Sequence, residues 1–540
     1  MNFYKKSLAY FMAAAFLFGA VSCENGFEDL NVDPFNPTET SVNFLFNNVI
    51  ASLRYERNEK LYLNGQKVYQ WSQLGVSTQE EPNQVNDLGR DPVWTDLFNE
   101  TRNIREIYKR LDEYTGDQER MTNRRALINI LYAYKALRVT DVYGDLPYSE
   151  AGQGISETEQ IFRPKYDTQE SIYRAALDDL KWAVDNIVVD PSATTPSGES
   201  YFTYGPTETL FGNDMLRWKR LANALRLRYA LRMSNVDQGG AQAIISDVLQ
   251  GGLDGLPQGH EDMFAFGNDW NNVGPDIYWA FEFFFGIRMG ENAWAHMTEN
   301  DNVDGSGIID PRVYVYFEPN IDNEWIPAPQ NPAEQTQRGG EPYNSNRRDE
   351  PDGFDFRGTY SGFNFYLVQN NDKGHEFHLA YPEVCFLLAE IYQRGLASGD
   401  AQEWYEKGVR ASIEKWYTFG STTHINWANP PAMPDDAAIE AFLQHPKIAY
   451  DAANGLTLIH TQRWLDLMLQ PQEAWHLSRR SGLIPMLAVQ NAVSGVDEPA
   501  PRRLRYPEDE RNNNLSNYET QVSKMSGGDE LSTRVWWDVN

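Results

Sequence analysis

The chain of 540 residues is predicted to fold as an all-α protein, and three observations carry this prediction. Apolar residues recur at helical spacing through most of the first 250 residues and again after residue 380. Small and large residues interleave over 387–413, a pattern typical of two closely packed helices. Between these parts, residues 253–380 are rich in Gly, Asn, Asp, Pro and aromatic residues, which predicts loops with a few short strands. We therefore expect a core of helical hairpins with one loop-rich excursion.

The helix expected at 216–234 organises the core. One face carries apolar and aromatic residues, namely Trp218, Leu221, Ala222, Leu225, Tyr229 and Met233. Six basic residues accompany them, namely Arg217, Lys219, Arg220, Arg226, Arg228 and Arg232, and Asp214 is placed to cap the helix. The chain has 77 acidic and 47 basic residues, so carboxylates on neighbouring helices are the most available partners. A phosphate or nucleic-acid site is the alternative, and the acidic balance argues against it.

Further helices are predicted in chain order from the same periodicity. They are expected around 94–111, beginning after Asp91 and Pro92, around 127–137, around 172–187, beginning after Asp167, and within 234–252. After the excursion they are expected at 381–395, 401–417, 435–450, 457–469 and 472–480. The pair at 381–417 has the pattern of a tetratricopeptide-type hairpin. Residues 482–540 are predicted to be irregular because prolines interrupt them.

The N-terminus is predicted to be an export signal over residues 1–22. Lys5 and Lys6 precede an apolar run at 8–21 that is too short to span a bilayer. Ala20-Val21-Ser22-Cys23 resembles the lipobox of bacterial lipoproteins, in which the cysteine thiol is diacylated and becomes the new N-terminus. Ala20 stands where Leu is usual, and Ala-x-Ser also suits an ordinary signal peptidase. Lipidation at Cys23 is the preferred interpretation, since the chain has only one other cysteine.

Residues 23–40 are predicted to form an extended, lipidated tether, because they are polar, contain two prolines and lack periodicity. Their acidic start resembles the signal that sends some Bacteroidetes lipoproteins to the outer face of the outer membrane. Cys385 lies among apolar residues and is expected to be a buried free thiol, so no disulfide is predicted.

The sequence contains no motif that specifies an enzyme. It lacks G-x-S-x-G, H-E-x-x-H, Walker and G-x-G-x-x-G patterns, and two cysteines exclude a cysteine-rich zinc site. His375 and His378 could form a metal pair on a helix, but no third ligand accompanies them. Residues 300–305 faintly match a calcium loop, although Pro311 occupies the position that requires Glu. No metal and no cofactor are predicted. A pair of catalytic carboxylates for glycoside hydrolysis remains an alternative, because such a pair is defined by its separation in space and not by a sequence motif.

The ligand site is predicted in the loop-rich part. Ten aromatic residues lie between Phe264 and Trp294, and their faces suit the C–H faces of sugar rings while amides bind hydroxyls. The predicted ligand-binding residues are Trp270, Asn271, Tyr278, Trp279 and, further along the chain, Trp325. Phe281 and 283–285 lack polar handles and are expected to fill the core. The loops around Trp71 and Trp325 are the next candidates.

Eight stretches in one order resemble the SusD/RagB family of outer-membrane nutrient-binding lipoproteins. They are NVDPFNPTE (31–39), VYGDLPYSEA (142–151), RWKRLANALRLRYALR (217–232), DPRVYVYFEP (310–319), RGTYSGF (357–363), YPEVCFLLAE (381–390), RWLDLMLQPQEAWHLSRRSGLIP (463–485) and PRRLRYPEDERNNN (501–514). They span most of the chain after residue 30. These stretches are scaffold, so the resemblance transfers no binding residue.

The resemblance implies a single SusD-like domain over 41–540, with a helical core at 41–252 and 381–480 and a loop-rich ligand-binding part at 253–380. It implies no enzymatic activity. It also implies a SusC-like TonB-dependent transporter as partner, with the lipoprotein forming a lid on the barrel. A glycan is the expected ligand and a peptide the alternative; a secreted glycoside hydrolase on a helical scaffold is the third interpretation. No nucleic-acid partner is predicted. We expect the chain to be lipid-anchored in the outer membrane and to face outward.

Overall fold

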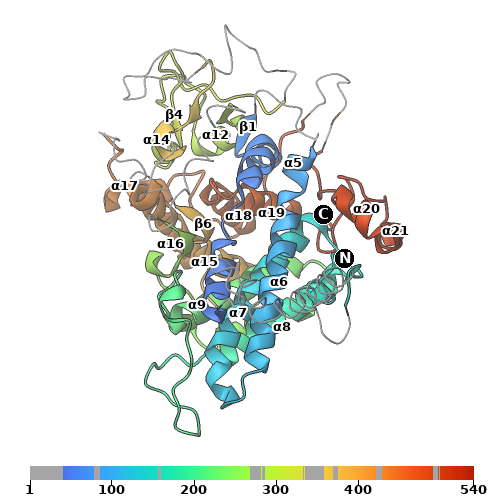
Figure 1. Ribbon diagram of the computed structural model, residues 1–540. Coiled ribbons are helices and arrows are strands. Elements are labelled where there is room, and N and C mark those ends of the chain that lie inside the picture. Colours follow the sequence, from blue (N-terminus) through green and yellow to red (C-terminus); the bar gives the residue numbers. More distant parts are fainter. Residues whose placement is uncertain are drawn as a thin grey trace, which may run out of the picture.

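The computed structural model describes residues 41–77, 85–155, 160–267, 281, 286–331, 334, 358–368, 375–420, 429–489, 497 and 499–540. Helices dominate the described chain, which confirms the all-α prediction (Figure 1). Those of the first half are α3 (Val42–Ala51), a π-helix (Glu59–Val68), α4 (Tyr69–Ser72), α5 (Asp87–Arg90), α6 (Pro92–Asp112), α7 (Thr122–Tyr143), α8 (Gln169–Asn186), α9 (Met215–Met233) and α10 (Gln238–Gln250). Those that follow are α12 (Glu291–Met297), α13 (Val313–Tyr316), α14 (Phe365–Val368), α15 (Tyr381–Gln393), α16 (Ala401–Lys415), α17 (Asp436–Leu443), α18 (Gly455–Asp466), α19 (Pro471–Ser481), α20 (Glu508–Asn513) and α21 (Leu515–Lys524).

Consecutive helices pack on one another to form the core. Helix α7 packs on α6 and α8, α9 packs on α8 and α10, and α15 packs on α16 and α18. The helix starts follow local chemistry: Pro92 occupies the first turn of α6, and the Thr168 hydroxyl caps α8 by accepting from Ser171 N at 3.2 Å. These contacts give the stacked helical hairpins that the sequence predicts.

Helix α9 lies in the middle of this core and is buried on nearly all sides. Asp214 caps it as predicted, accepting from the backbone N–H groups of Leu216 and Arg217 at 3.0 and 3.1 Å. Its arginines are paired with carboxylates from other elements: Arg220 with Asp262, Arg226 with Asp247, Arg228 with Glu383, and Arg232 with Asp141 and Glu473. The predicted ion-paired structural helix is therefore confirmed.

The loop-rich part contains short strands. Strands β1 (Gly75–Ser77), β3 (Ile287–Met289), β5 (Gly362–Phe363) and β4 (Phe317–Glu318) form one antiparallel sheet in that order. Strands β2 (Phe264–Phe266) and β6 (Glu376–Leu379) pair antiparallel. Figure 1 shows β1, β4, α12 and α14 at one end of the molecule, and α6 to α9 towards the other.

The buried apolar residues form two main clusters that meet at α4 and α19. Trp71 and Trp475 belong to the cluster around α6 to α10. Tyr69, two residues before Trp71 in α4, and Leu477 belong to the cluster around α15 to α18. The short helix α4 and helix α19 thus join the two halves of the core, and they contact each other directly.

Two sequence expectations are wrong at the C-terminal side. The helix expected at 435–450 ends at Leu443, because Pro446 follows within a turn and cannot continue the helical hydrogen bonding. Residues 482–540 are not irregular throughout, since α20 and α21 lie there. Helix α21 buries Tyr518 and Gln521 on one side, and its otherwise polar sequence concealed the periodicity.

Candidate ligand-binding site

Most of the predicted ligand site falls on residues that the structure does not describe. Trp270, Asn271, Tyr278 and Trp279 lie outside the described residues. Phe281 is described and is buried in the core, as expected for an aromatic residue without polar neighbours. Trp325 is the one predicted ligand residue whose surroundings the structure gives.

Trp325 belongs to a described aromatic group on the loop-rich part. Its indole lies parallel to that of Trp294, with ring centroids 5.8 Å apart and an interplanar angle of 11°. Tyr314 meets Trp325 edge-on at 6.2 Å and is 46% exposed. The backbone N–H of Trp325 donates to the Val303 carbonyl at 2.8 Å, which fixes the loop. One face of Trp325 is therefore used by Trp294, while Tyr314 extends the group to the surface.

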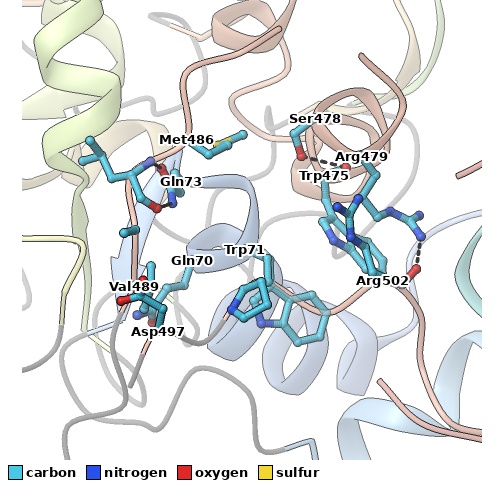
Figure 2. A pocket seen from close by; sticks show the side chains of 14 residues that line it. Gln70, Trp71, Gln73, Trp475, Ser478, Arg479, Met486, Val489, Asp497 and Arg502 are labelled. Carbon is cyan, nitrogen blue, oxygen red and sulfur yellow. Dashed lines mark hydrogen bonds between the residues drawn. The ribbon is translucent and has the colours of Figure 1, made fainter. Parts of the chain in front are cut away.

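A cavity of about 540 Å³ lies where α4 and α19 meet the chain that follows α19. We call it the Gln70 cavity. It is lined by Gln70, Trp71, Gln73, Trp475, Ser478, Arg479, Met486, Leu487, Ala488, Val489, Asp497, Pro499, Ala500 and Arg502 (Figure 2). Its volume is in the range of small-molecule sites, and most of its wall is apolar.

The Gln70 carboxamide is the unusual polar group of this wall. Gln70 is 2% exposed, and neither its Nε2 nor its Oε1 has a hydrogen-bond partner among the described residues. Its backbone carbonyl accepts from Gln330 Nε2 at 3.1 Å, so the main chain is held while the side chain is free. Buried amides normally have partners because each unmet group costs about 1–3 kcal/mol. Both atoms are closed to solvent, so the carboxamide lies behind the cavity surface as an unpaired buried group.

Two indoles form the aromatic part of the cavity. The Trp71 and Trp475 rings are 5.1 Å apart at 49°, and Figure 2 shows Trp71 between Gln70 and Trp475 in this view. Trp475 Nε1 donates to the Pro501 carbonyl at 2.9 Å, which fixes the ring. The Arg479 guanidinium lies 3.8 Å above the Trp475 ring and donates to the carbonyls of Arg502 and Asp141. The wall is thus rigid before any ligand binds.

Gln73 holds the cavity rim. Its Nε2 donates to the Leu487 carbonyl and its Oε1 accepts from the Leu487 N–H, both at 2.9 Å. Asn292 Nδ2 also donates to Gln73 Oε1 at 2.8 Å, and the same amide donates to the Pro485 carbonyl at 2.9 Å. Gln73 itself has a left-handed backbone (φ 57°), which turns the chain from α4 towards β1. Both polar atoms of its side chain are used structurally, in contrast to those of Gln70.

The charges at the cavity are engaged or balanced. Arg502 pairs with Asp538 at 3.0 Å. Burial lowers the pKa of Arg479, whose two Nη atoms donate to carbonyls and whose guanidinium lies near both the Trp475 and Trp537 rings. Asp497 contributes an acidic side chain to the same wall.

A second hollow, of about 480 Å³, lies beside α21 and has a more polar wall. Its buried arginine, Arg503, pairs with Asp529 at 3.2 Å and lies 4.4 Å above the Tyr506 ring. The exposed Lys524 and the ion-paired Arg534 complete its basic side. It offers no aromatic wall comparable to Trp71 and Trp475.

The His375–His378 pair does not lie on a helix, because 376–379 form strand β6. Both nitrogens of His378 are used: Nδ1 bonds the Tyr134 hydroxyl at 2.8 Å and Nε2 contacts Glu376 at 3.1 Å. Burial alone would raise the pKa of Glu376, but Lys60 and His378 hold it at about 2. Within the described residues, no three His, Cys, Asp or Glu side chains are grouped to hold a metal ion.

Sequence reasoning missed this cavity for an identifiable reason. Trp71 is named among the alternative places to look, but Trp475 lies 404 positions later, in a stretch assigned to the scaffold. Nothing in the local sequence of Gln70 separates it from Gln73, since only the fold shows which amide has partners. Across the described ranges, no helix is long and apolar enough to cross a membrane.

A scaffold of stacked helical hairpins with a loop-rich part at one end is the architecture that the comparisons with known proteins address. The family model SusD-like_2, described as "Starch-binding associating with outer membrane", matches residues 34–507. The chain therefore belongs to this SusD-like family of proteins that bind nutrients at the outer membrane.

Solved structures share the fold. A chitin-binding protein is 24% identical, with a TM-score of 0.69 and coverage of 93% of this chain and 100% of that chain. A chitin-binding SusD homologue from Flavobacterium johnsoniae is 23% identical, with a TM-score of 0.66 and coverage of 92% and 98%. A SusD homologue from Parabacteroides distasonis is 22% identical, with a TM-score of 0.70 and coverage of 93% and 98%. The comparison with curated proteins finds no match.

Proposed function

We propose that this protein is a surface lipoprotein that binds neutral glycan oligomers and delivers them to a SusC-like TonB-dependent transporter. The family match over residues 34–507 carries the proposal, since its description couples starch binding to the outer membrane. The chitin-binding names of two similar structures support a glycan over other nutrients. Binding, and not catalysis, is the proposed activity.

The described chemistry supports a neutral ligand. The protein carries a formal net charge of −30, which repels polyanions at long range. Trp325 and the exposed Tyr314, backed by the buried Trp294, supply aromatic rings in the part of the chain where the predicted Trp270, Asn271, Tyr278 and Trp279 also lie. Stacking on such rings and hydrogen bonding to amides require no activated acid, base or nucleophile.

Cys23 is proposed as the lipid anchor, and residues 24–38 as the tether to an outward-facing domain. A diacyl anchor holds a protein stably at a membrane, whereas one chain does not. A tether of this composition lets the domain swing while it stays close to a barrel rim.

The test is glycan binding by the exported Cys23→Ala chain, measured by affinity electrophoresis on starch, chitin, xylan, mannan and β-glucan and then by calorimetry on hexasaccharides. We expect saturable binding to at least one neutral glycan, with the glycan recovered intact. Binding only to peptides, or to none of the panel, would contradict the proposal. Cleavage at enzymatic rates would support the hydrolase instead.

A further inference from the structure

The turn that follows α17 connects the helical core with the loop-rich part. Ile448 anchors this turn, because its side chain is buried in the core and its carbonyl accepts from the Tyr405 hydroxyl of α16 at 2.6 Å. Two other side chains of the turn, those of His445 and Lys447, contact residues 295–299. The turn is therefore fixed on the core at one side and contacts the end of α12 at the other.

Lys447 binds the C-terminal end of α12. Its Nζ donates to the Thr298 carbonyl at 2.6 Å and to the Ala295 carbonyl at 3.3 Å. The last carbonyls of a helix have no partner within the helix, and the helix dipole favours a cation beside them. The Thr298 hydroxyl in turn donates to the Trp294 carbonyl at 2.9 Å. Lys447 therefore helps to fix the helix that carries Trp294, the inner indole of the Trp294–Trp325 pair.

His445 binds the next residue, Glu299, where the loop 299–308 begins. His445 Nε2 lies 2.6 Å from Glu299 Oε1, and His445 Nδ1 accepts from the Lys447 N–H at 3.2 Å. The neutral imidazole therefore carries its proton on Nε2 and donates it to the carboxylate. The Glu299 N–H donates to the Gly307 carbonyl at 2.7 Å and closes the loop. The base of the loop is thus held by the turn after α17.

The loop 299–308 positions the outer indole of the pair, that of Trp325. The Val303 carbonyl accepts from the Trp325 N–H at 2.8 Å. Gly305 lies directly against the ring: its φ is 76°, and a Cβ at this position would stand 2.8 Å from both Cδ1 and Nε1 of Trp325. Because no side chain separates this glycine from the indole, a displacement of the loop would also displace the ring.

We propose that His445 and Lys447 are positioning residues for Trp325, and that they set its affinity for a glycan through α12 and the loop 299–308. The inference rests on the proposed glycan binding and on the prediction that Trp325 belongs to the ligand site. Rings that are held in place before the ligand arrives bind it more tightly, because less freedom is lost on binding. Trp294 backs one face of Trp325, so both rings have to be held.

The first test measures the loop without any ligand, by hydrogen exchange and mass spectrometry. Lys447→Met should speed exchange of the hydrogen-bonded amides of Glu299 and Trp325, and Lys447→Arg, which keeps a donor, should restore the parent rate. His445→Ala should act in the same direction as Lys447→Met. Lys524→Met, which removes an exposed lysine of α21, is the matched control and should leave both amides unchanged. Equal exchange in the parent, Lys447→Met and His445→Ala would overturn the inference.

The second test measures whether the positioning affects the ligand. Maltohexaose and chitohexaose are titrated by calorimetry into the parent, Lys447→Met, Trp325→Ala and the double variant. We expect Lys447→Met to weaken binding of the bound hexasaccharide about threefold or more, and to have no further effect once the Trp325 ring is absent. Equal weakening with and without the Trp325 ring would show a general effect on the fold and would overturn the inference.

The outcomes separate this inference from the proposed function. If the parent binds a hexasaccharide and Lys447→Met, shown to be folded by thermal melting, binds it equally well, the positioning role is wrong and the proposed function stands. If the parent binds neither hexasaccharide nor any glycan of the panel, the proposed function fails and the positioning role in binding fails with it.

Discussion

Arg228 on α9 and Glu383 on α15 form a fully buried, two-pronged ion pair. Arg228 Nε donates to Glu383 Oε1 at 2.8 Å and Nη2 donates to Oε2 at 2.5 Å. Arg463 on α18 donates to the same carboxylate at 2.6 Å, so one acid joins three helices. This triad fixes the relative positions of the hairpins that carry the cavity.

The first prediction concerns this triad. Glu383→Gln removes the carboxylate that Arg463 and Arg228 both bind, and leaves Arg228 only the more distant Glu473 at 3.9 Å. We expect the free energy of unfolding to fall by about 3–5 kcal/mol. Urea unfolding followed by circular dichroism measures it. The exposed Glu403→Gln, on α16, is the control and should change stability by less than about 0.5 kcal/mol.

Replacing the whole triad provides the complementary result. Arg228→Met, Glu383→Leu and Arg463→Met together remove every charge, so we expect the combined variant to lose less stability than Glu383→Gln alone. If instead Glu383→Gln unfolds at the same urea concentration as the parent, the carboxylate does not compensate the guanidiniums as inferred.

The second prediction is acid sensitivity that begins above the carboxylate range. Burial, aided by Arg479 and Arg232, lowers the pKa of His476 to about 4 despite the nearby Glu473. Between about pH 6.5 and 4 the unfolded chain binds a proton at this histidine that the folded chain does not. Stability is therefore fully present above pH 6.5 and falls as the pH drops, by about 3 kcal/mol for this group at pH 4.

Replacing this histidine isolates its share of the acid sensitivity. His476→Phe keeps a ring between Trp475 and Trp537 and cannot take up a proton. Its unfolding free energy, measured at intervals from pH 7 to pH 4, should fall less steeply than that of the parent. Parallel profiles for the two proteins would exclude His476 as a source of the dependence.

The sequence predicted the helical core more completely than the ligand site, and the physical reason differs between them. In a helix such as α9, apolar residues recur every three or four positions, which the sequence shows directly. Its surplus of arginines in an acidic chain predicts carboxylate partners. Strand β1 has only three residues, too few to show a periodic pattern in the sequence. It forms by pairing with β3, which lies over 200 residues away in the chain. The cavity joins Gln70 and Trp475 across a still longer separation in the chain, so no local pattern reveals it.

The third prediction concerns the aromatic stretch in the loop-rich part. Trp270→Ala and Trp279→Ala should each weaken binding of the preferred hexasaccharide by roughly 1–3 kcal/mol, as for buried aromatic hot spots. Trp325→Ala should have a smaller effect, because Trp294 already occupies one face of its ring. Calorimetry measures the affinities, and Phe162→Ala, which removes a 74% exposed ring ahead of α8, is the control. If the Trp270 and Trp279 variants fold and bind like the parent, this stretch is not the site.

The fourth prediction concerns the lipid anchor. Cys23→Ala should move the protein from the membrane fraction to the soluble fraction, and protease added to whole cells should cleave the intact lipoprotein. Cys385→Ala is the matched control, because that thiol is fully buried and burial raises its pKa to about 12. Membrane fractionation of the Cys23 variant that matches the parent would contradict lipidation at this position.

The fifth prediction concerns the transporter. A lid must contact the barrel rim while its tether remains attached to the membrane, so the complex should depend on both the folded domain and residues 24–38. We expect the tagged protein to co-purify with a large TonB-dependent barrel from native membranes in mild detergent. The Cys23→Ala chain should recover less of the barrel, because losing the anchor lowers its effective concentration at the rim. Recovery of the parent only as a free monomer, from cells that express both genes, would contradict the partnership and leave the glycan-binding tests unaffected.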